Sequence, residues 1–211
     1  MNKPLIKNII FDLAEVLLTG IKDTGLALAE KHQLNVKSDH TADWTNGPTP
    51  LLVPLVKEFF NGNVNEDEYV KQVLELYPQI GHAEWLKQHI RENFKEVEGT
   101  RDIIVRLKKL GYKLALLSVH GEEWVEYLEK KFDYHKLFDV LSYSYETKVS
   151  KPDPLSFKHV LEKLKAPPEE CLFIDDSYKN VAVAKELGIN AILFTSAKDL
   201  EKDLRELGII T

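Results

Sequence analysis

The stretch NIIFDL, residues 8–13, decides the fold of this chain. Residues 8–11 form a short, largely apolar run typical of a strand buried on both faces, and Asp12 follows where that strand ends. The same pairing of an apolar run with a polar end recurs twice. These runs are 113–117, which ends at Ser118, and 171–174, which ends at Asp175 and Asp176.

Helical patterns of about ten residues separate these apolar runs. Strands that alternate with helices of this length indicate a parallel sheet with helices on both of its faces. The sequence therefore predicts the α/β class. The expected helices are 101–110, 122–132, 154–164, 180–187 and 197–207, and further strands are expected at 140–145 and 190–194.

Residues 16–96 have a different pattern, without a convincing strand. Glycine, proline and asparagine residues punctuate four helical candidates there. We interpret this segment as an all-helical insertion between the first two strands of the sheet, so that 1–15 and 97–211 form the core domain. The four expected helices are 23–32, 51–60, 67–76 and 83–94.

The composition excludes several classes of protein. The 211 residues carry a net charge of −6, which argues against nucleic acid as the main ligand, because phosphate backbones select basic surfaces. Cys171 is the only cysteine, so a disulfide scaffold is excluded. No apolar stretch approaches the roughly 20 residues of a membrane span. We therefore expect a cytoplasmic protein without a nucleic-acid or membrane partner.

Four polar features follow the expected strands or the loops beside them: Asp12, Ser118, Lys151 and the pair Asp175-Asp176. Ligands of open parallel sheets bind at the carboxyl ends of the strands. There, one carboxylate can attack phosphorus while other carboxylates hold Mg²⁺. A hydroxyl and a lysine suit the oxygens of a phosphoryl group, which predicts a small phosphorylated metabolite as the substrate.

These residues resemble the haloacid dehalogenase-like hydrolases. The resemblance rests on four motifs in the family's order: the IIFDL start, Leu-Leu-Ser at 116–118, Lys-Pro-Asp-Pro at 151–154, and Phe-Ile-Asp-Asp-Ser at 173–177. It implies a Rossmann-like core with a helical cap formed by the insertion. The roles it implies are Asp12 as nucleophile, Ser118 and Lys151 as phosphate ligands, Mg²⁺ ligation by Asp12, Asp176 and the Ala14 carbonyl, Asp175 acting mainly through a water, and Asn180 as a supporting residue.

Two positions depart from this resemblance. Phosphatases of the family usually carry a second aspartate two residues after the nucleophile, where this chain has Ala14, and Val119 replaces a common asparagine. Loss of an acid–base group costs about 10²- to 10⁴-fold in rate. The departure thus predicts a slower enzyme that favours substrates with good leaving groups, such as acyl, anomeric or aryl phosphates.

His120 and Glu15 are the candidates to replace the missing acid. His120 follows Ser118 closely, and its unperturbed pKa near 6.5 suits proton transfer; the alternative is a solvated loop histidine. Glu15 could equally point away from the site. The aromatic residues Trp44, Tyr69 and Trp85 of the insertion are expected mainly to pack among its helices, with a substrate pocket as the alternative.

The favoured function is an Mg²⁺-dependent phosphatase that acts through an aspartyl-phosphate at Asp12. Ala14 and Val119 keep open a catalytically silent relative that serves as a binding or regulatory protein. Displacement of halide is a third hypothesis. It is disfavoured by Asp175-Asp176, because that reaction does not need a metal.

Overall fold

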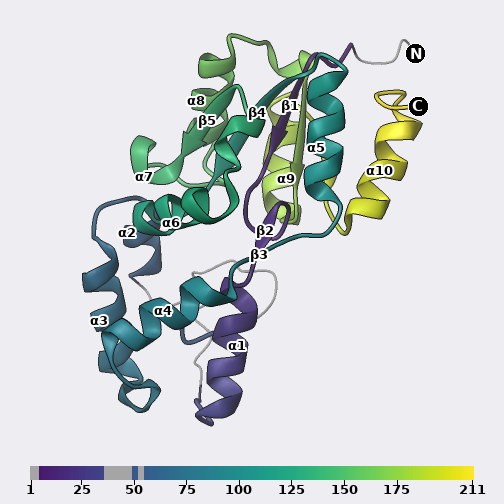
Figure 1. Cartoon of the computed structure of the whole chain (residues 1–211). Coiled ribbons are helices and arrows are strands. Elements are labelled where there is room, and N and C mark those ends of the chain that lie inside the picture. Colours follow the sequence, from purple (N-terminus) through teal and green to yellow (C-terminus); the bar gives the residue numbers. More distant parts are fainter. Residues whose placement is uncertain (1–4, 36–48, 52–54) are drawn as a thin grey trace.

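A computed structural model of the chain describes residues 5–35, 49–51 and 55–211. Its centre is a five-stranded sheet in the order β5-β4-β1-β6-β7, in which all neighbouring strands are parallel (Figure 1). The strands are β1 (Asn8–Phe11), β4 (Lys113–Ser118), β5 (Val140–Tyr143), β6 (Cys171–Asp175) and β7 (Asn190–Leu193). The predicted α/β class and parallel sheet are confirmed.

Alternate side chains of the central strand pack on opposite faces of the sheet. Ile9 and Phe11 belong to one buried cluster, whereas Ile10 belongs to another, together with Phe157 of α8 (Pro154–Leu164) and Ala184 of α9 (Tyr178–Glu186). An apolar run without polar alternation therefore marks a strand that is covered by helices on both faces. The two layers make this strand fully buried, and they hold its end rigidly.

Helices of the core lie close to the predicted ranges, with ends that differ by a residue or two. The pair α8 and α9 covers one face of the sheet, and α5 and α10 pack against each other beside the other face (Figure 1). The core helices are α5 (Thr100–Lys109), α6 (Glu122–Phe132), α7 (Ser144–Thr147), α8 (Pro154–Leu164), α9 (Tyr178–Glu186) and α10 (Ala197–Glu206), with 3₁₀ turns η2 (His135–Leu137) and η3 (Pro168–Glu170).

The described residues of the insertion, 16–96, are largely helical, as predicted, and they lie beyond the carboxyl ends of the strands (Figure 1). Its predicted helix at 51–60 starts later, at Val56, and residues 52–54 lie outside the described part. The elements are α1 (Ile21–Lys31), α2 (Val56–Phe60), α3 (Glu66–Leu76), η1 (Pro78–Ile80) and α4 (Ala83–Asn93).

The expectation that no strand interrupts residues 16–96 is wrong at both ends of that segment. Leu18 and Thr19 form β2 (Leu18–Thr19), which pairs antiparallel with β3 (Lys95–Glu96). Each strand has only two residues, too few to show the alternation that identifies a strand in a sequence. The pair brings the two ends of the insertion together beside the sheet.

The chain reverses its direction of travel across the sheet at β1. From β1 it reaches β4 and β5 on one side, and then returns to β6 and β7 on the other. The carboxyl end of β1 is thus a topological switch point, where open α/β sheets bind their ligands. None of the helices in the described residues is long and apolar enough to cross a membrane.

Candidate active site

Asp12 lies at the end of β1, one residue beyond the paired Phe11 and Ile174. Its backbone N–H donates to the Ile174 carbonyl, 2.9 Å away, so the strand pairing continues through this residue. The side chain is nearly buried, and its Oδ1 accepts the backbone N–H of Leu13 at 2.7 Å. The sheet thus fixes both the backbone and one carboxylate oxygen of Asp12.

Asp175 and Asp176, at the end of the neighbouring strand β6, face Asp12. One oxygen from each of these three carboxylates lies within 4.8 Å of the others. We call this group the carboxylate cluster. The Nζ of Lys151, whose side chain is 2% exposed, lies 2.8 Å from Asp12 Oδ1 and 2.6 Å from Asp175 Oδ2. The structure therefore brings together four residues that the sequence assigns to one site.

The loop after β6 orients Asp175 with two further donors. Its Oδ1 accepts the backbone N–H of Ser177 at 2.8 Å and the Nδ2 of Asn180 at 2.9 Å. With Lys151 on Oδ2, both oxygens of this fully buried carboxylate are held by the protein. The supporting position expected for Asn180 agrees with this geometry.

The cluster holds more negative charge than one lysine offsets. Burial raises the pKa of Asp12 well above its usual range; Lys151 opposes the rise, and the neighbouring carboxylates add to it. Burial and then the charge of Asp175 raise the pKa of Asp176 to about 6. Burial by itself lowers the pKa of Lys151, but the two carboxylates beside it outweigh burial and the net pKa is raised. A further cation would relieve this repulsion.

Ala14 and Glu15 form a tight turn after the cluster's first aspartate. The Leu13 carbonyl accepts two N–H groups, at 2.9 and 3.0 Å, and Glu15 N–H donates to the Leu18 carbonyl at 2.7 Å. Glu15 has a left-handed backbone, with φ of 58°, and its Oε2 accepts the Thr19 hydroxyl at 2.7 Å. Its charge adds a small contribution to the raised pKa of Asp176, after burial and Asp175.

Ser118 ends β4, the strand beside β1. Leu116 pairs with Phe11, so Ser118 lies two residues beyond that pair, on the same edge of the sheet as Asp12. Its side chain is 1% exposed, and its Oγ has no hydrogen-bond partner among the described residues. A buried hydroxyl without a protein partner is suited to a ligand oxygen, because an unsatisfied buried polar group costs free energy.

His120 is buried, so it is not the solvated loop histidine that the sequence left open as an alternative. It is 2% exposed, and its ring lies among the rings of Phe60, Phe94 and Trp124, with centroids 5.6 to 6.1 Å away. Burial lowers its pKa to about 3. An imidazole that stays neutral near pH 7 has no imidazolium proton to give, so this environment argues against His120 as the surrogate acid.

The aromatic residues of the insertion mostly pack, as expected. Tyr69 is fully buried and stacks on Phe59, with ring centroids 4.8 Å apart, and Trp85 stacks on His89 at 4.7 Å. Trp44 lies outside the described residues.

Sequence reasoning missed the polar contacts that join the insertion to the core near this site. They involve Asn61 and Glu66 in the insertion, and Ser144, Ser150 and Trp124 in the core. Serine and asparagine residues in turns have many structural uses, and no spacing sets these apart. Only the three-dimensional pairing identifies them.

The chain is thus an α/β protein in which three carboxylates and a lysine lie at the switch point of a parallel sheet, with a largely helical insertion after the first strand. The chain belongs to the haloacid dehalogenase-like hydrolases: the model of that family matches residues 9–194. The resemblance seen in the four motifs is thereby confirmed.

Similar curated proteins are phosphatases and related hydrolases. The chain is 26% identical to glyceraldehyde 3-phosphate phosphatase of Pyrococcus abyssi over 92% of its own length and 83% of that protein. It is 36% identical to phosphorylated carbohydrates phosphatase of Thermotoga maritima over 58% of the chain and 56% of that protein. Flavin mononucleotide hydrolase 1 of Arabidopsis thaliana is 28% identical over 72% of the chain. The chain spans 56% of the Thermotoga protein and 61% of the Arabidopsis protein, which is less than two thirds of each.

Solved structures share the fold. The HAD family enzyme BT-2542 of Bacteroides thetaiotaomicron matches with a TM-score of 0.76 at 24% identity, over 95% of this chain and 98% of that one. The same enzyme in complex with magnesium and inorganic phosphate matches with a TM-score of 0.67 at 24% identity, over 90% and 95%. A predicted HAD-like hydrolase from Porphyromonas gingivalis matches with a TM-score of 0.72 at 22% identity, over 98% and 100%.

Proposed function

We propose that this protein is an Mg²⁺-dependent phosphatase of a small phosphorylated metabolite, a sugar phosphate or a similar compound. One observation carries the proposal: three carboxylates converge on one point, and among the described residues one lysine pairs with two of them. Such a group has little structural use, because buried like charges repel each other. Relatives named as phosphatases of glyceraldehyde 3-phosphate and of phosphorylated carbohydrates support this class of substrate.

The donor set fits Mg²⁺. This ion prefers carboxylate and carbonyl oxygens and keeps several of its waters. Asp12, Asp176 and the Ala14 carbonyl are proposed to hold it, with Asp175 acting through a water. The raised pKa values of Asp12 and Asp176 are the sign of negative charge that a bound cation would offset. When bound, Mg²⁺ supplies charge neutralisation between an anionic nucleophile and an anionic substrate.

The protein's own residues account for the chemical steps. Asp12 Oδ1 is held by Leu13 N–H and Lys151, whereas Oδ2 receives no hydrogen bond from the described residues. Oδ2 therefore attacks phosphorus, the bond from phosphorus to the leaving oxygen breaks, and an aspartyl-phosphate forms. Water then attacks the same phosphorus, phosphate leaves, and the carboxylate is restored. Ser118 and Lys151 hold the phosphoryl oxygens in both steps.

The proposal includes the division of the chain into a core, 1–15 and 97–211, and a cap, 16–96, that selects the substrate. Because position 14 is an alanine, no side chain at this position can donate a proton to the leaving group. With His120 in an apolar environment, the preferred substrates are those whose leaving group needs little protonation, including aryl and anomeric phosphates.

A panel of aryl, sugar and acyl phosphates, assayed with and without Mg²⁺, tests the proposal. Phosphate release that requires Mg²⁺ supports it. Absence of release from every compound, with the ion bound, favours the second candidate, a silent relative in which Ala14 marks the lost activity. Release of halide from a 2-haloacid without any metal indicates a dehalogenase instead.

A further inference from the structure

The turn at the end of α2, residues 60–62, contacts the start of α7 and the segment that precedes Lys151. The Phe60 carbonyl accepts the hydroxyl of Ser144. The same Ser144 Oγ accepts the backbone N–H of His120 at 3.2 Å, two residues after Ser118. Phe59 reinforces this contact, because a Cβ added to Gly121 would lie 2.1 Å from its ring. The insertion thus touches the loop that follows β4.

The same turn contacts the segment that leads into Lys151. Asn61, which is 6% exposed, accepts the hydroxyl of Ser150 on its Oδ1. Lys148 Nζ donates to the Gly62 carbonyl at 2.7 Å. Gly62 has φ of +65°, and a Cβ there would lie 2.9 Å from the backbone oxygen of Tyr145, so a larger residue would be strained here. Two contacts from the turn therefore hold residues 148–150.

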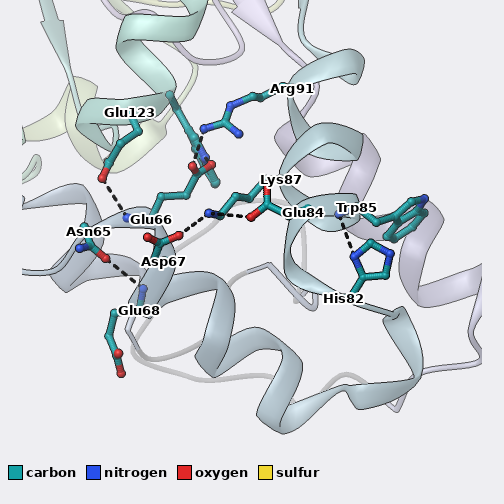
Figure 2. A network of polar contacts seen from close by, with 11 residues as sticks. Asn65, Glu66, Asp67, Glu68, His82, Glu84, Trp85, Lys87, Arg91 and Glu123 are labelled. Carbon is teal, nitrogen blue, oxygen red and sulfur yellow. Dashed lines mark hydrogen bonds and ion pairs between the residues drawn. The ribbon is translucent and has the colours of Figure 1, made fainter.

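A second set of contacts joins the insertion to the core close to this turn. The carboxylate of Glu66, which is 4% exposed, pairs with Arg91 of α4 and accepts the Trp124 Nε1 of α6 at 2.7 Å. Its backbone N–H donates to Glu123 Oε1 at 3.0 Å (Figure 2). We call these four residues the Glu66 junction. It joins α3 and α4 to the core helix α6. Because α3 begins shortly after the turn, the junction also restrains the turn relative to the core.

Lys151 is the residue whose position depends on these contacts. Its Nζ lies within 2.8 Å of carboxylates from two different strands, although its own backbone lies in a loop. Bonds within the core, such as Asp153 N–H to the Ser150 carbonyl at 3.0 Å, hold part of this loop, and Asn61 holds the Ser150 side chain from the insertion. Displacement by about 1 Å at a reacting centre can cost about 10²-fold in rate.

We infer that Asn61 is a positioning residue: through Ser150 it sets the backbone that aims Lys151 between Asp12 and Asp175, and it thereby links the insertion to the phosphate-binding end of the site. This inference rests on the proposed function, since it assigns a task in phosphoryl transfer to a residue outside the site.

The test compares two asparagines that follow α2, Asn61 in the turn and Asn63 just after it. Asn61→Ala should lower kcat for an aryl phosphate by about tenfold or more, with a smaller change in KM. Asn61→Asp should restore most of the loss, because a carboxylate oxygen also accepts the Ser150 hydroxyl. Asn63→Ala is the matched control and should keep the parent kcat, because the Asn63 side chain bonds Glu58 of the insertion, at 2.8 Å.

Ser150→Ala should reproduce the loss, and the double variant Asn61→Ala/Ser150→Ala should lose no more than either single variant, because one hydrogen bond is removed in all three. Additive losses, or an Asn61→Ala enzyme with the kcat of Asn63→Ala, overturn the inference. So does an Asn61→Asp variant that is as slow as Asn61→Ala.

Amide hydrogen exchange of residues 148–153, measured without substrate, separates this inference from the proposed function. Faster exchange in Asn61→Ala than in Asn63→Ala supports positioning, and equal exchange overturns it, whether or not the parent hydrolyses phosphate esters. A parent that releases no phosphate in the presence of Mg²⁺ refutes the proposed function instead.

Discussion

The carboxylate cluster and the Glu66 junction both bury acidic side chains, yet their charges are balanced differently. Glu66 pairs with Arg91, and its other oxygen accepts an indole N–H, so one negative charge meets one positive charge. In the cluster, three carboxylates lie together, and Lys151 pairs with two of them, Asp12 and Asp175. Burial and mutual repulsion raise two of their pKa values.

This difference distinguishes a structural acid from a functional one. A buried ion pair with its hydrogen bonds satisfied joins two parts of a molecule and needs nothing else. A cluster with excess charge is unfavourable unless a ligand completes it, and such perturbed groups gather at functional sites. Substitutions at the two places should therefore have opposite effects on stability and on activity.

The largest effect is expected for Asp12→Asn. An amide is a poor nucleophile, so Mg²⁺-dependent phosphate release should fall by roughly 10³-fold or more. The metal-free variant should be at least as stable as the parent, because one charge is removed from a group that burial already disfavours. Steady-state assays and thermal unfolding measure the two effects, and unchanged turnover would remove Asp12 from the mechanism.

Glu66→Ala should show the reverse pattern. It leaves Arg91 and the Trp124 N–H without their partner, and the free energy of unfolding should fall by about 3 kcal/mol. The control is Glu68→Ala, in the same helical turn, whose exposed ion pair with Lys71 is worth at most about 1 kcal/mol. Chemical denaturation gives both values. Equal losses in the two variants contradict a structural role for the Glu66 junction.

The affinity for Mg²⁺ should depend on pH with a break near 6. Above that pH the Asp176 carboxyl, whose pKa is raised to about 6, is ionised and free to bind. Below it a proton must first be displaced, so the apparent Kd should rise by up to about tenfold per pH unit. Titration calorimetry at several pH values measures this. The profile of Asp176→Asn should be flatter, and a flat profile in the parent contradicts the assignment.

Ala14→Asp should raise turnover of an aryl phosphate by about tenfold or more. The added carboxylate can protonate the leaving oxygen and then deprotonate the attacking water. In the parent, hydrolysis of the intermediate should be slow, which gives a burst of product in rapid-mixing experiments. Ala14→Asn is the control of similar size. If both variants behave alike and neither exceeds the parent, the missing aspartate does not limit the reaction.

The smallest effect on activity is expected for His120→Phe. The ring would remain among aromatic neighbours, and kcat should stay within about twofold of the parent. The substitution should instead change the stability of the protein at acidic pH. The folded-state pKa of His120 is about 3, below the unfolded value near 6.5, so unfolding takes up a proton and stability falls as the pH drops below 6.5. Denaturation between pH 7 and 4 should show less loss in the variant.

The sequence predicted the features that depend on neighbours along the chain. The apolar runs before Asp12 and Asp175 identified buried strands, and four motifs placed their ends at one edge of the sheet. The two-residue strands β2 and β3 carry no such pattern. The burial of His120 had no local signal, because two of the rings around it, Phe60 and Phe94, are distant in the sequence. The Asn61–Ser150 bond spans 89 positions, and no local signal marks it.

The β2–β3 pair has a consequence for how this fold can change. Leu18 pairs with Glu96 and Thr19 with Lys95, so the insertion leaves and re-enters the core through adjacent points. Because the entropy of closing a loop grows slowly with its length, the number of residues between the two strands has little effect on the stability of the core. The pair thus allows the length of the insertion to vary, whereas the contacts of Asn61 and Glu66 with the core limit which of its residues can vary.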